Sequence, residues 1–223
     1  MTNTGLDLRC YVITAGHGRE VVETAASAAA GGAGIIQVRE KTLGTRDLLG
    51  FTLEVARAVR SAKPSTKVVV DDHVDIARAA ELREPGLVHG VHLGQDDLPV
   101  DLARAMLGPD AIIGLTTGTL QLVDAANDVA EWIDYIGAGP FRPTPTKDSG
   151  RPPLGVDGYR PLVEIARRPI VAIGDVQPTD VRDLAATGVA GVALVRAVMG
   201  APDAGAVVGE ILAEYAQGAS RVR

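Results

Sequence analysis

The segment whose residue types point most directly to chemistry is a loop-like run rich in glycine, proline and hydroxyl side chains. It reads GAGPFRPTPTKDSG over residues 137–150 and follows an apolar run, residues 132–136, that is predicted to form a strand. Thr144 and Thr146 come just before Lys147. Hydroxyl donors and an ammonium group can converge on phosphate oxygens, so the segment suits an oxyanion ligand. An ordinary Pro/Gly-rich surface connection has the same composition, and the loop alone does not separate the two interpretations.

Polar side chains also follow most of the other predicted strands. They comprise amides, basic groups, hydroxyls and carboxylates: Gln37, Arg39, Lys41, Asp71, Asp72, Asp97, Thr116, Asp175 and Arg196. Because side chains alternate along a strand, residues 37, 39 and 41 lie on one side while Val38 faces the other. A random solvated surface would not collect all these groups at strand ends, so the pattern predicts one shared ligand site.

Two of the carboxylates suggest a metal ion. Asp72 and Asp97 end neighbouring predicted strands, where their oxygens could converge on a hard cation while phosphate oxygens and water complete an octahedron. The alternative is that such aspartates cap the following helices, which is the interpretation we accept for Asp101. A transition-metal site is disfavoured, because the four histidines show no i,i+4 pairing and there is a single cysteine. His92, at a strand end, is expected to be a packed or hydrogen-bonded barrel residue rather than a catalytic base.

Composition narrows the class of protein. The 223 residues are 46% hydrophobic but only 3% aromatic, which is typical of buried parallel strands flanked by helices of small residues. A net charge of −6 disfavours binding to nucleic acid or to an acidic membrane. Cys10, in the first apolar run, is expected to be a buried inert thiol in a reducing compartment. With no membrane-spanning stretch or signal pattern, a cytoplasmic location is expected. The oligomeric state stays open, a homo-oligomer included.

The elements that must position these residues alternate regularly. Strands are predicted at residues 9–14, 34–38, 67–70, 90–93, 111–115, 132–136, 169–173 and 191–195. Helices are predicted at residues 21–30, 46–61, 74–80, 101–106, 120–130, 158–167, 179–186 and 203–215. Eight strand–helix pairs without a composition break predict an α/β fold, a single (β/α)₈ barrel over residues 1–223, with a tail that frays after Gly218. The alternative, an open doubly wound sheet, is usually built from fewer strands at this length.

Capping residues agree with several of these boundaries. Thr45 is expected to cap the second helix, and residues 178–180 to open the seventh. Glycines at positions 31, 32 and 188 are expected to close helices. In such a barrel the reactive face is built at the C-terminal ends of the strands, where the polar residues lie.

Four motifs together resemble the thiamine phosphate synthase family, also called thiamine-phosphate pyrophosphorylase. They are QVREK at residues 37–41, GVHLGQDD at 90–97, GLTTGT at 114–119 and DYIGAGPFRPTPTKD at 134–148. The resemblance implies a TIM barrel that joins an aminopyrimidine methyl diphosphate to a hydroxyethylthiazole phosphate, with Mg²⁺ as the required cofactor. Thiamine phosphate and diphosphate are the implied products.

The resemblance also implies roles for individual residues. Arg39, Lys41 and Lys147 match the family's diphosphate ligands and are the implied catalytic groups. Thr116 is implied near the diphosphate, at a position where the family usually has serine. Gln37 matches the glutamine on the pyrimidine side, and Asp71 replaces a substrate-binding asparagine. Asp72 and Asp97 match the Mg²⁺ carboxylates. The thiazole phosphate site is implied at Thr144, Thr146, Gly174, Asp175, Val195 and Arg196.

The chain departs from the family pattern in that last site. Asp175 interrupts a strand ending that is typically Ile-Gly-Gly-Ile, and Arg196 replaces a serine; residues 81–89 also form a longer stretch than usual. One hypothesis is that Arg196 neutralises Asp175. The alternative places Arg196 along an outer helix and Asp175 as a helix cap.

Two other functions remain as alternatives: a thiazole-phosphate tautomerase on the same barrel, which needs a base and no metal, and a non-catalytic sensor of a phosphorylated ligand.

Overall fold

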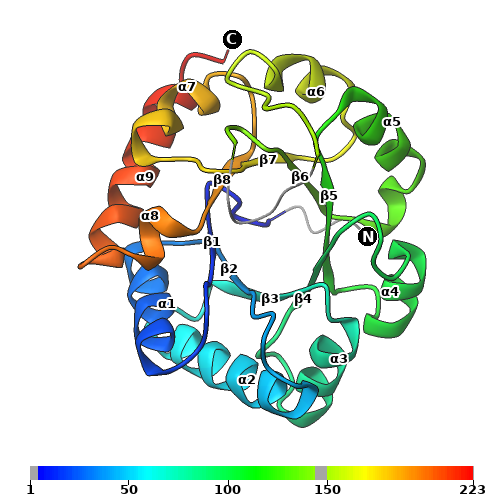
Figure 1. Ribbon diagram of the computed structural model, residues 1–223, viewed down its shortest axis with the longest axis vertical. Helices are drawn as coiled ribbons and strands as arrows, with labels where there is room; N and C mark the ends of the chain where they lie inside the picture. Colours follow the sequence, from blue (N-terminus) through cyan, green and yellow to red (C-terminus); the bar gives the residue numbers. More distant parts are fainter. Residues whose placement is uncertain (1–4, 144–149, 223) are drawn as a thin grey trace.

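The computed structural model describes residues 5–143 and 150–222, and within them the chain forms a closed barrel of parallel strands ringed by helices (Figure 1). The strands follow one another around the barrel in chain order, and β1 pairs with β8 to close it, with Cys10 opposite Val192. They are β1 Cys10–Ile13, β2 Ile35–Val38, β3 Lys67–Asp71, β4 Gly90–Leu93, β5 Ile112–Thr117, β6 Tyr135–Ala138, β7 Ile170–Ile173 and β8 Gly191–Leu194. The predicted (β/α)₈ barrel is therefore confirmed.

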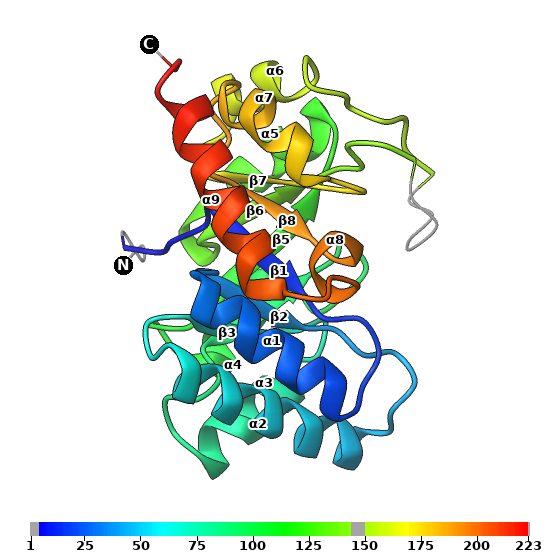
Figure 2. The ribbon, with the colours of Figure 1, turned by 90° about the vertical axis from the view of Figure 1, so that its left-hand side faces the viewer.

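Helices cover the outside of the barrel, and Figure 2 shows α1 and α9 side by side against it. The α-helices are α1 Arg19–Gly31, α2 Thr45–Ala62, α3 Val74–Arg83, α4 Val100–Leu107, α5 Leu120–Asp128, α6 Tyr159–Ile165, α7 Val181–Ala185, α8 Arg196–Met199 and α9 Ala204–Ala219. Two 3₁₀ turns, η1 Ala130–Trp132 and η2 Pro178–Asp180, complete the described elements. Among the described residues, no helix combines the length and apolar character needed to cross a membrane.

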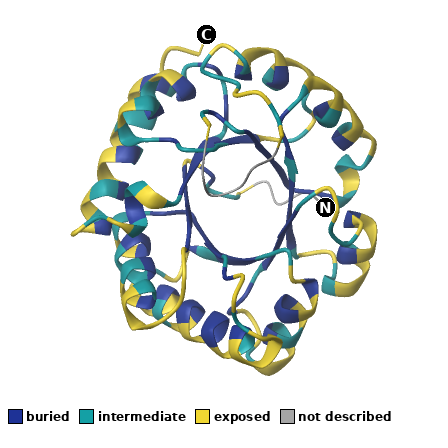
Figure 3. Cartoon of the chain, viewed as in Figure 1, coloured by how far each residue is buried: buried dark blue, intermediate teal, exposed yellow. Residues whose placement is uncertain are grey.

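The strands are buried on both faces, as Figure 3 shows by their colour. Alternation along β1 explains how one strand serves two cores. Tyr11 and Ile13 point into the barrel, whereas Cys10 and Val12 pack in the layer between the strands and the helices. This explains why the sequence shows continuous apolar runs instead of alternation with polar residues. Cys10 is fully buried, and burial raises the pKa of its thiol to about 12, as expected of an inert side chain.

The structure corrects several predicted boundaries. The sixth strand begins at Tyr135 and not at residue 132, because residues 130–132 form the turn η1 and Tyr135 pairs with Gly114 of β5. Thr45 is the first residue of α2, and Gly44 occupies the N-cap position. Asp101 likewise lies in the first turn of α4 and does not cap it; Pro99 takes that position.

Other boundaries agree with the sequence or extend it. Gly32 ends α1 in the left-handed conformation, with φ of 117°, as its position predicted. Helix α9 continues to Ala219, four residues beyond the predicted end, and the Tyr215 hydroxyl donates to the carbonyl of Val189, 2.8 Å away. The short helix α8 was not predicted, since four residues are too few to show a periodic pattern.

Candidate active site

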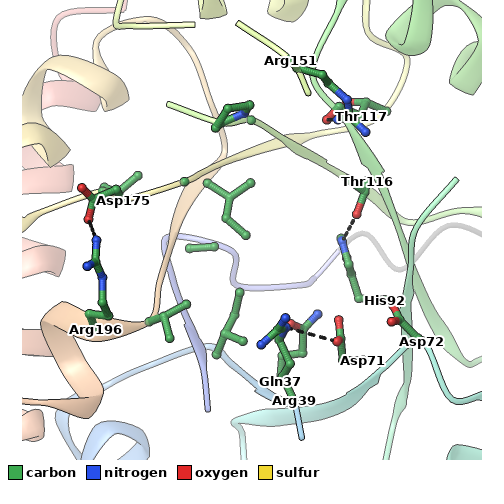
Figure 4. Close-up of a pocket in the computed structure, with 18 of the residues that line it drawn as sticks. Gln37, Arg39, Asp71, Asp72, His92, Thr116, Thr117, Arg151, Asp175 and Arg196 are labelled. Atoms are coloured by element: carbon green, nitrogen blue, oxygen red, sulfur yellow. Dashed lines mark hydrogen bonds and ion pairs between the residues drawn. The ribbon is translucent and has the colours of Figure 1, made fainter. Parts of the chain in front are cut away.

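A cavity of about 290 Å³ lies at the C-terminal ends of the strands, where the polar residues of the sequence motifs meet (Figure 4). Its lining comes from nearly every strand of the barrel. It includes Gln37, Arg39, Lys41, Asp71, Asp72, His92, Thr116, Thr117, Arg151, Gly174, Asp175, Gln177, Val195 and Arg196, with apolar contributions from Ile13, Ile173 and Ala193. Thr144, Thr146 and Lys147, which the sequence assigns to this site, lie outside the described residues.

Cations from the end of β2 meet carboxylates from the end of β3. The Lys41 ammonium lies 2.7 Å from Asp71 Oδ2 and also contacts Asp72, and Arg39 Nε lies 3.4 Å from the same Asp71 oxygen. Burial opposes the charge on Lys41, but its hydrogen bonds to the two aspartates outweigh burial and raise its pKa. Burial, together with the neighbouring Asp72, raises the pKa of Asp71. The site therefore holds anions and cations in close contact.

The carboxyls of Asp72 and Asp97 lie close enough to interact. Asp72 has a left-handed backbone, with φ of 60°, a conformation that Asp tolerates better than most residues. Asp97 accepts a hydrogen bond of 2.6 Å from the backbone N–H of Gly94. Burial raises the pKa of Asp97, and the nearby carboxyls of Asp72 and Asp71 raise it further. Such crowding of carboxylates disfavours the ionised state unless a cation is close.

The side chains near the cavity limit which metal ion could bind there. In the parts of the chain that the structure describes, no three His, Cys, Asp or Glu side chains are grouped so that they could hold a metal by themselves. The Asp72–Asp97 pair offers only oxygen donors, which fit a hard cation whose other ligands are substrate oxygens and water. The residues present therefore fit Mg²⁺ bound jointly with an anionic ligand.

His92 lies one residue before the end of β4 and is held on both ring nitrogens. Its Nδ1 lies 2.9 Å from the Tyr135 hydroxyl, and its Nε2 lies 2.9 Å from Thr116 Oγ1. The ring also stacks on Tyr135, with 5.5 Å between centroids. The prediction of a hydrogen-bonded barrel histidine is confirmed.

On the other side of the cavity, Asp175 and Arg196 form an ion pair (Figure 4). Asp175 has φ of 57° and also accepts from the Gln177 side chain at 3.2 Å. Gln177, and not Asp175, is the N-cap of the following 3₁₀ turn. The predicted pairing is therefore confirmed, and the alternative in which Asp175 caps the next helix is wrong. Arg196 does begin a helix, α8, and its side chain returns to the cavity.

Gly174 follows β7 where the backbone passes close to the β6 loop. It has φ of 108°, and a Cβ atom there would lie 2.7 Å from Pro140 Cα. Any other residue would be strained and would push these two loops apart. The glycine thus sets the spacing between the β6 and β7 ends of the cavity.

Arg151 is a cavity residue that the sequence motifs did not identify. Its guanidinium donates to the carbonyl oxygen of Thr117 at 2.5 Å, which ties the β6–α6 connection to the end of β5. It lies four residues after Lys147, beyond the last residue of the motif. No spacing signal in a single sequence separates this arginine from those on the surface.

A (β/α)₈ barrel with cations, paired carboxylates and hydroxyls around one cavity at the strand ends has the architecture of an enzyme for small anionic substrates. The sequence matches the family Thiamine monophosphate synthase over residues 10–198. The chain is 56% identical to the thiamine-phosphate synthase of Corynebacterium jeikeium (strain K411), over 98% of this chain and 100% of that protein. It is 37% identical to that of Moorella thermoacetica, over 86% of each.

A solved structure supports the same family. Thiamine phosphate pyrophosphorylase from Pyrococcus furiosus superposes with a TM-score of 0.80 at 32% identity, over 96% of this chain and 98% of that one. The chain belongs to the thiamine monophosphate synthase family, and it is an enzyme.

Proposed function

We propose that this enzyme condenses 4-amino-2-methyl-5-pyrimidinylmethyl diphosphate with hydroxyethylthiazole phosphate and releases thiamine phosphate and diphosphate. The observation that carries the proposal is the cluster of Arg39, Lys41 and convergent aspartates at the cavity mouth. Such a cluster suits a diphosphate leaving group. Two relatives named thiamine-phosphate synthase, at 56% and 58% identity, support the same activity.

The reaction needs a stabilised leaving group more than it needs a base. The C–O bond to diphosphate breaks, and its electron pair leaves with the diphosphate. The lone pair of the thiazole nitrogen then forms the new C–N bond to the pyrimidine methylene carbon, and no proton has to be removed. Arg39 and Lys41, with Lys147 as a third cation, stabilise the charge that develops on the leaving oxygen. The cavity holds the thiazole in position for attack.

Mg²⁺ completes this proposal as a cofactor. Asp72 and Asp97 would hold it, since their oxygens converge and their crowding is relieved by a cation. When bound, the ion supplies positive charge beside the diphosphate oxygens. Lys41 contacts both Asp71 and Asp72, so a metal ion held by Asp72 would compete with that contact.

The two substrates are assigned to opposite sides of the cavity. Gln37 takes the pyrimidine, with Asp71 beside it, and Thr116 takes the diphosphate. The thiazole phosphate is assigned to Thr144 and Thr146, to Gly174 and Asp175 after β7, and to Val195 and Arg196 after β8. The Asp175–Arg196 ion pair cancels the carboxylate that would otherwise repel this phosphate.

The test is release of diphosphate by the purified protein with both substrates and Mg²⁺. We expect release only when both substrates are present, and a loss of release when the metal is chelated. A thiazole-phosphate tautomerase would turn over its substrate without diphosphate release or metal. A sensor would bind a ligand without turnover.

A further inference from the structure

A row of hydrogen-bonded side chains crosses the interior of the barrel beneath the cavity. The Gln37 amide nitrogen lies 3.0 Å from the Tyr11 hydroxyl, which lies 2.8 Å from the Tyr135 hydroxyl. Tyr135 is 2.9 Å from His92 Nδ1, and His92 Nε2 is 2.9 Å from Thr116 Oγ1. The row begins and ends at residues that line the cavity, whereas Tyr11 and Tyr135 are not among its lining residues.

The row joins strands that are not neighbours. Tyr11 belongs to β1 and Tyr135 to β6, and these strands lie on different parts of the barrel wall. Their side chains meet in the barrel interior, where the rings pack edge to face with 5.7 Å between centroids. The contact therefore links the Gln37 side of the cavity to the Thr116 side.

Two glycines make room for this arrangement. A Cβ atom on Gly114 of β5 would lie 2.4 Å from the Tyr135 hydroxyl oxygen and 2.5 Å from His92 Nδ1. A Cβ atom on Gly137 of β6 would lie 3.0 Å from His92 Cε1. Any larger residue at position 114 would displace the hydrogen bond between Tyr135 and His92. The chain thus has glycine at the points where the row needs space.

Both tyrosines remain protonated. They are almost completely buried, and burial raises the pKa of each hydroxyl well above its usual range. Each can therefore donate one hydrogen bond and accept another. Along the row, each middle member lies between two hydrogen-bond partners, so the direction of one bond sets the direction of the next.

We propose that Tyr11, Tyr135 and His92 are positioning residues that fix the direction of the Thr116 hydroxyl, so that its proton points into the cavity toward an anionic ligand. The Gln37 amide donates to Tyr11, Tyr11 donates to Tyr135, and Tyr135 donates to His92 Nδ1. His92 then carries its proton on Nε2 and donates it to Thr116 Oγ1. Thr116, having accepted that bond, directs its own proton at the ligand.

If every hydrogen bond in the row ran in the opposite direction, binding of an anion would be unfavourable. Thr116 would donate to His92, and its lone pairs would face the negative charge. Identifying the anion as the diphosphate rests on the proposed function, but the order of the row does not. The pyrimidine side and the anion side are then coupled, because a change in the Gln37 amide is passed to Thr116 through three buried groups.

The tautomer of His92 reports this order directly. It is read from long-range ¹H–¹⁵N spectra of ¹⁵N-labelled protein near neutral pH, with His92 assigned from its absence in His92→Asn. We expect the Nε2–H tautomer in the wild-type protein and a loss of that preference in Tyr135→Phe. An Nδ1–H tautomer in the wild type, or an unchanged tautomer in Tyr135→Phe, would overturn the proposal.

Kinetics supply a second readout. Because Tyr135→Phe leaves Thr116 in place but removes its orientation, we expect kcat to fall about tenfold, less than for loss of a donor. The KM for the pyrimidine diphosphate should change less. In a Thr116→Val background the same change should have no further effect on kcat. Additive effects, or an unchanged kcat in Tyr135→Phe, would refute the coupling.

Tyr159→Phe is the matched control. Tyr159 is also fully buried, but its hydroxyl donates to the Ala138 carbonyl at 2.9 Å, in the layer between the barrel and its helices. It should lower stability without changing kcat or the His92 tautomer. If Tyr135→Phe does not fold, Tyr11→Phe tests the same order one link further along. Absence of diphosphate release by the wild type would refute the proposed function. The His92 tautomer would still show whether the hydrogen bonds of the row have the proposed direction.

Discussion

Replacing Lys41 tests whether its ammonium group acts in catalysis or only stabilises the fold. In Lys41→Met the ammonium that lies 2.7 Å from Asp71 is lost, while most of the apolar stem is kept. The Lys41 side chain is 41% exposed, so solvent screens the pair and its contribution to folding is about 1 kcal/mol or less. Its contribution to a diphosphate leaving group is larger, about 2–4 kcal/mol by comparison with a lost oxyanion donor.

These two magnitudes predict distinct results. The rate of a single turnover should fall about 30- to 1000-fold, while the melting temperature should change by no more than about 2–4 °C. Lys67→Met is the control, because Lys67 begins the strand β3 that Asp71 ends and so lies at the opposite end of the barrel. It should keep wild-type turnover. A single-turnover rate for Lys41→Met within about twofold of the wild type would refute the leaving-group role.

Four further predictions follow from the same site. Asp97→Asn should strongly raise the Mg²⁺ concentration for half-maximal activity and leave circular dichroism unchanged; an unchanged Mg²⁺ dependence would make Asp97 only an anchor for its loop. Lys147→Ala should reduce turnover far more than it weakens thiazole phosphate binding, and equal losses measured by titration and single turnover would argue against that role. Arg196→Ala should raise the KM for thiazole phosphate, and Asp175→Gly with Arg196→Ser should largely restore it, whereas additive effects would exclude coupling. Glu40 is buried, but hydrogen bonds from Thr42 and His17 lower its pKa to about 2 from 4.5. Its contribution to stability is therefore complete above about pH 4.5 and is lost as the pH falls toward 2; denaturation of Glu40→Gln with the same acid dependence as the wild type would contradict this.

The barrel was predictable because its pattern is local and repeated. Each strand is a short apolar run, and β4 was predicted at its observed bounds of Gly90–Leu93. Some helices are bounded by glycine or a capping residue, such as Gly32 after α1 and Thr119 before α5. Predicted strand boundaries were wrong where the local apolar pattern and the pairing of the strands disagree. The run near Trp132 is apolar, but residues 130–132 form the turn η1 and the strand begins only at Tyr135.

Much of the site was also predictable, for a topological reason. Parallel strands in a barrel bring their C-terminal ends together, so residues at those ends become neighbours. The ion pair between Asp175 and Arg196 follows from the adjacency of β7 and β8. The close contact of Lys41 with Asp71 and Asp72 was not predicted, because alternation gives the side of a strand and not the reach of a long side chain.

The row beneath the cavity was hidden from the sequence. Tyr11 and Tyr135 are 124 residues apart, and the sequence pattern marks each only as a core position of a strand. Gly114 and Gly137 read as ordinary strand glycines until the atoms around them are known. Only the three-dimensional structure shows that these four residues and His92 belong to one arrangement.

The central claim is tested most directly by one measurement of diphosphate release. Purified protein is mixed with pyrimidinylmethyl diphosphate and Mg²⁺, with and without hydroxyethylthiazole phosphate, and diphosphate and thiamine phosphate are quantified together. The account predicts equal amounts of both products when both substrates are present. Sustained turnover of either substrate alone, or no thiamine phosphate from the pair, would contradict it.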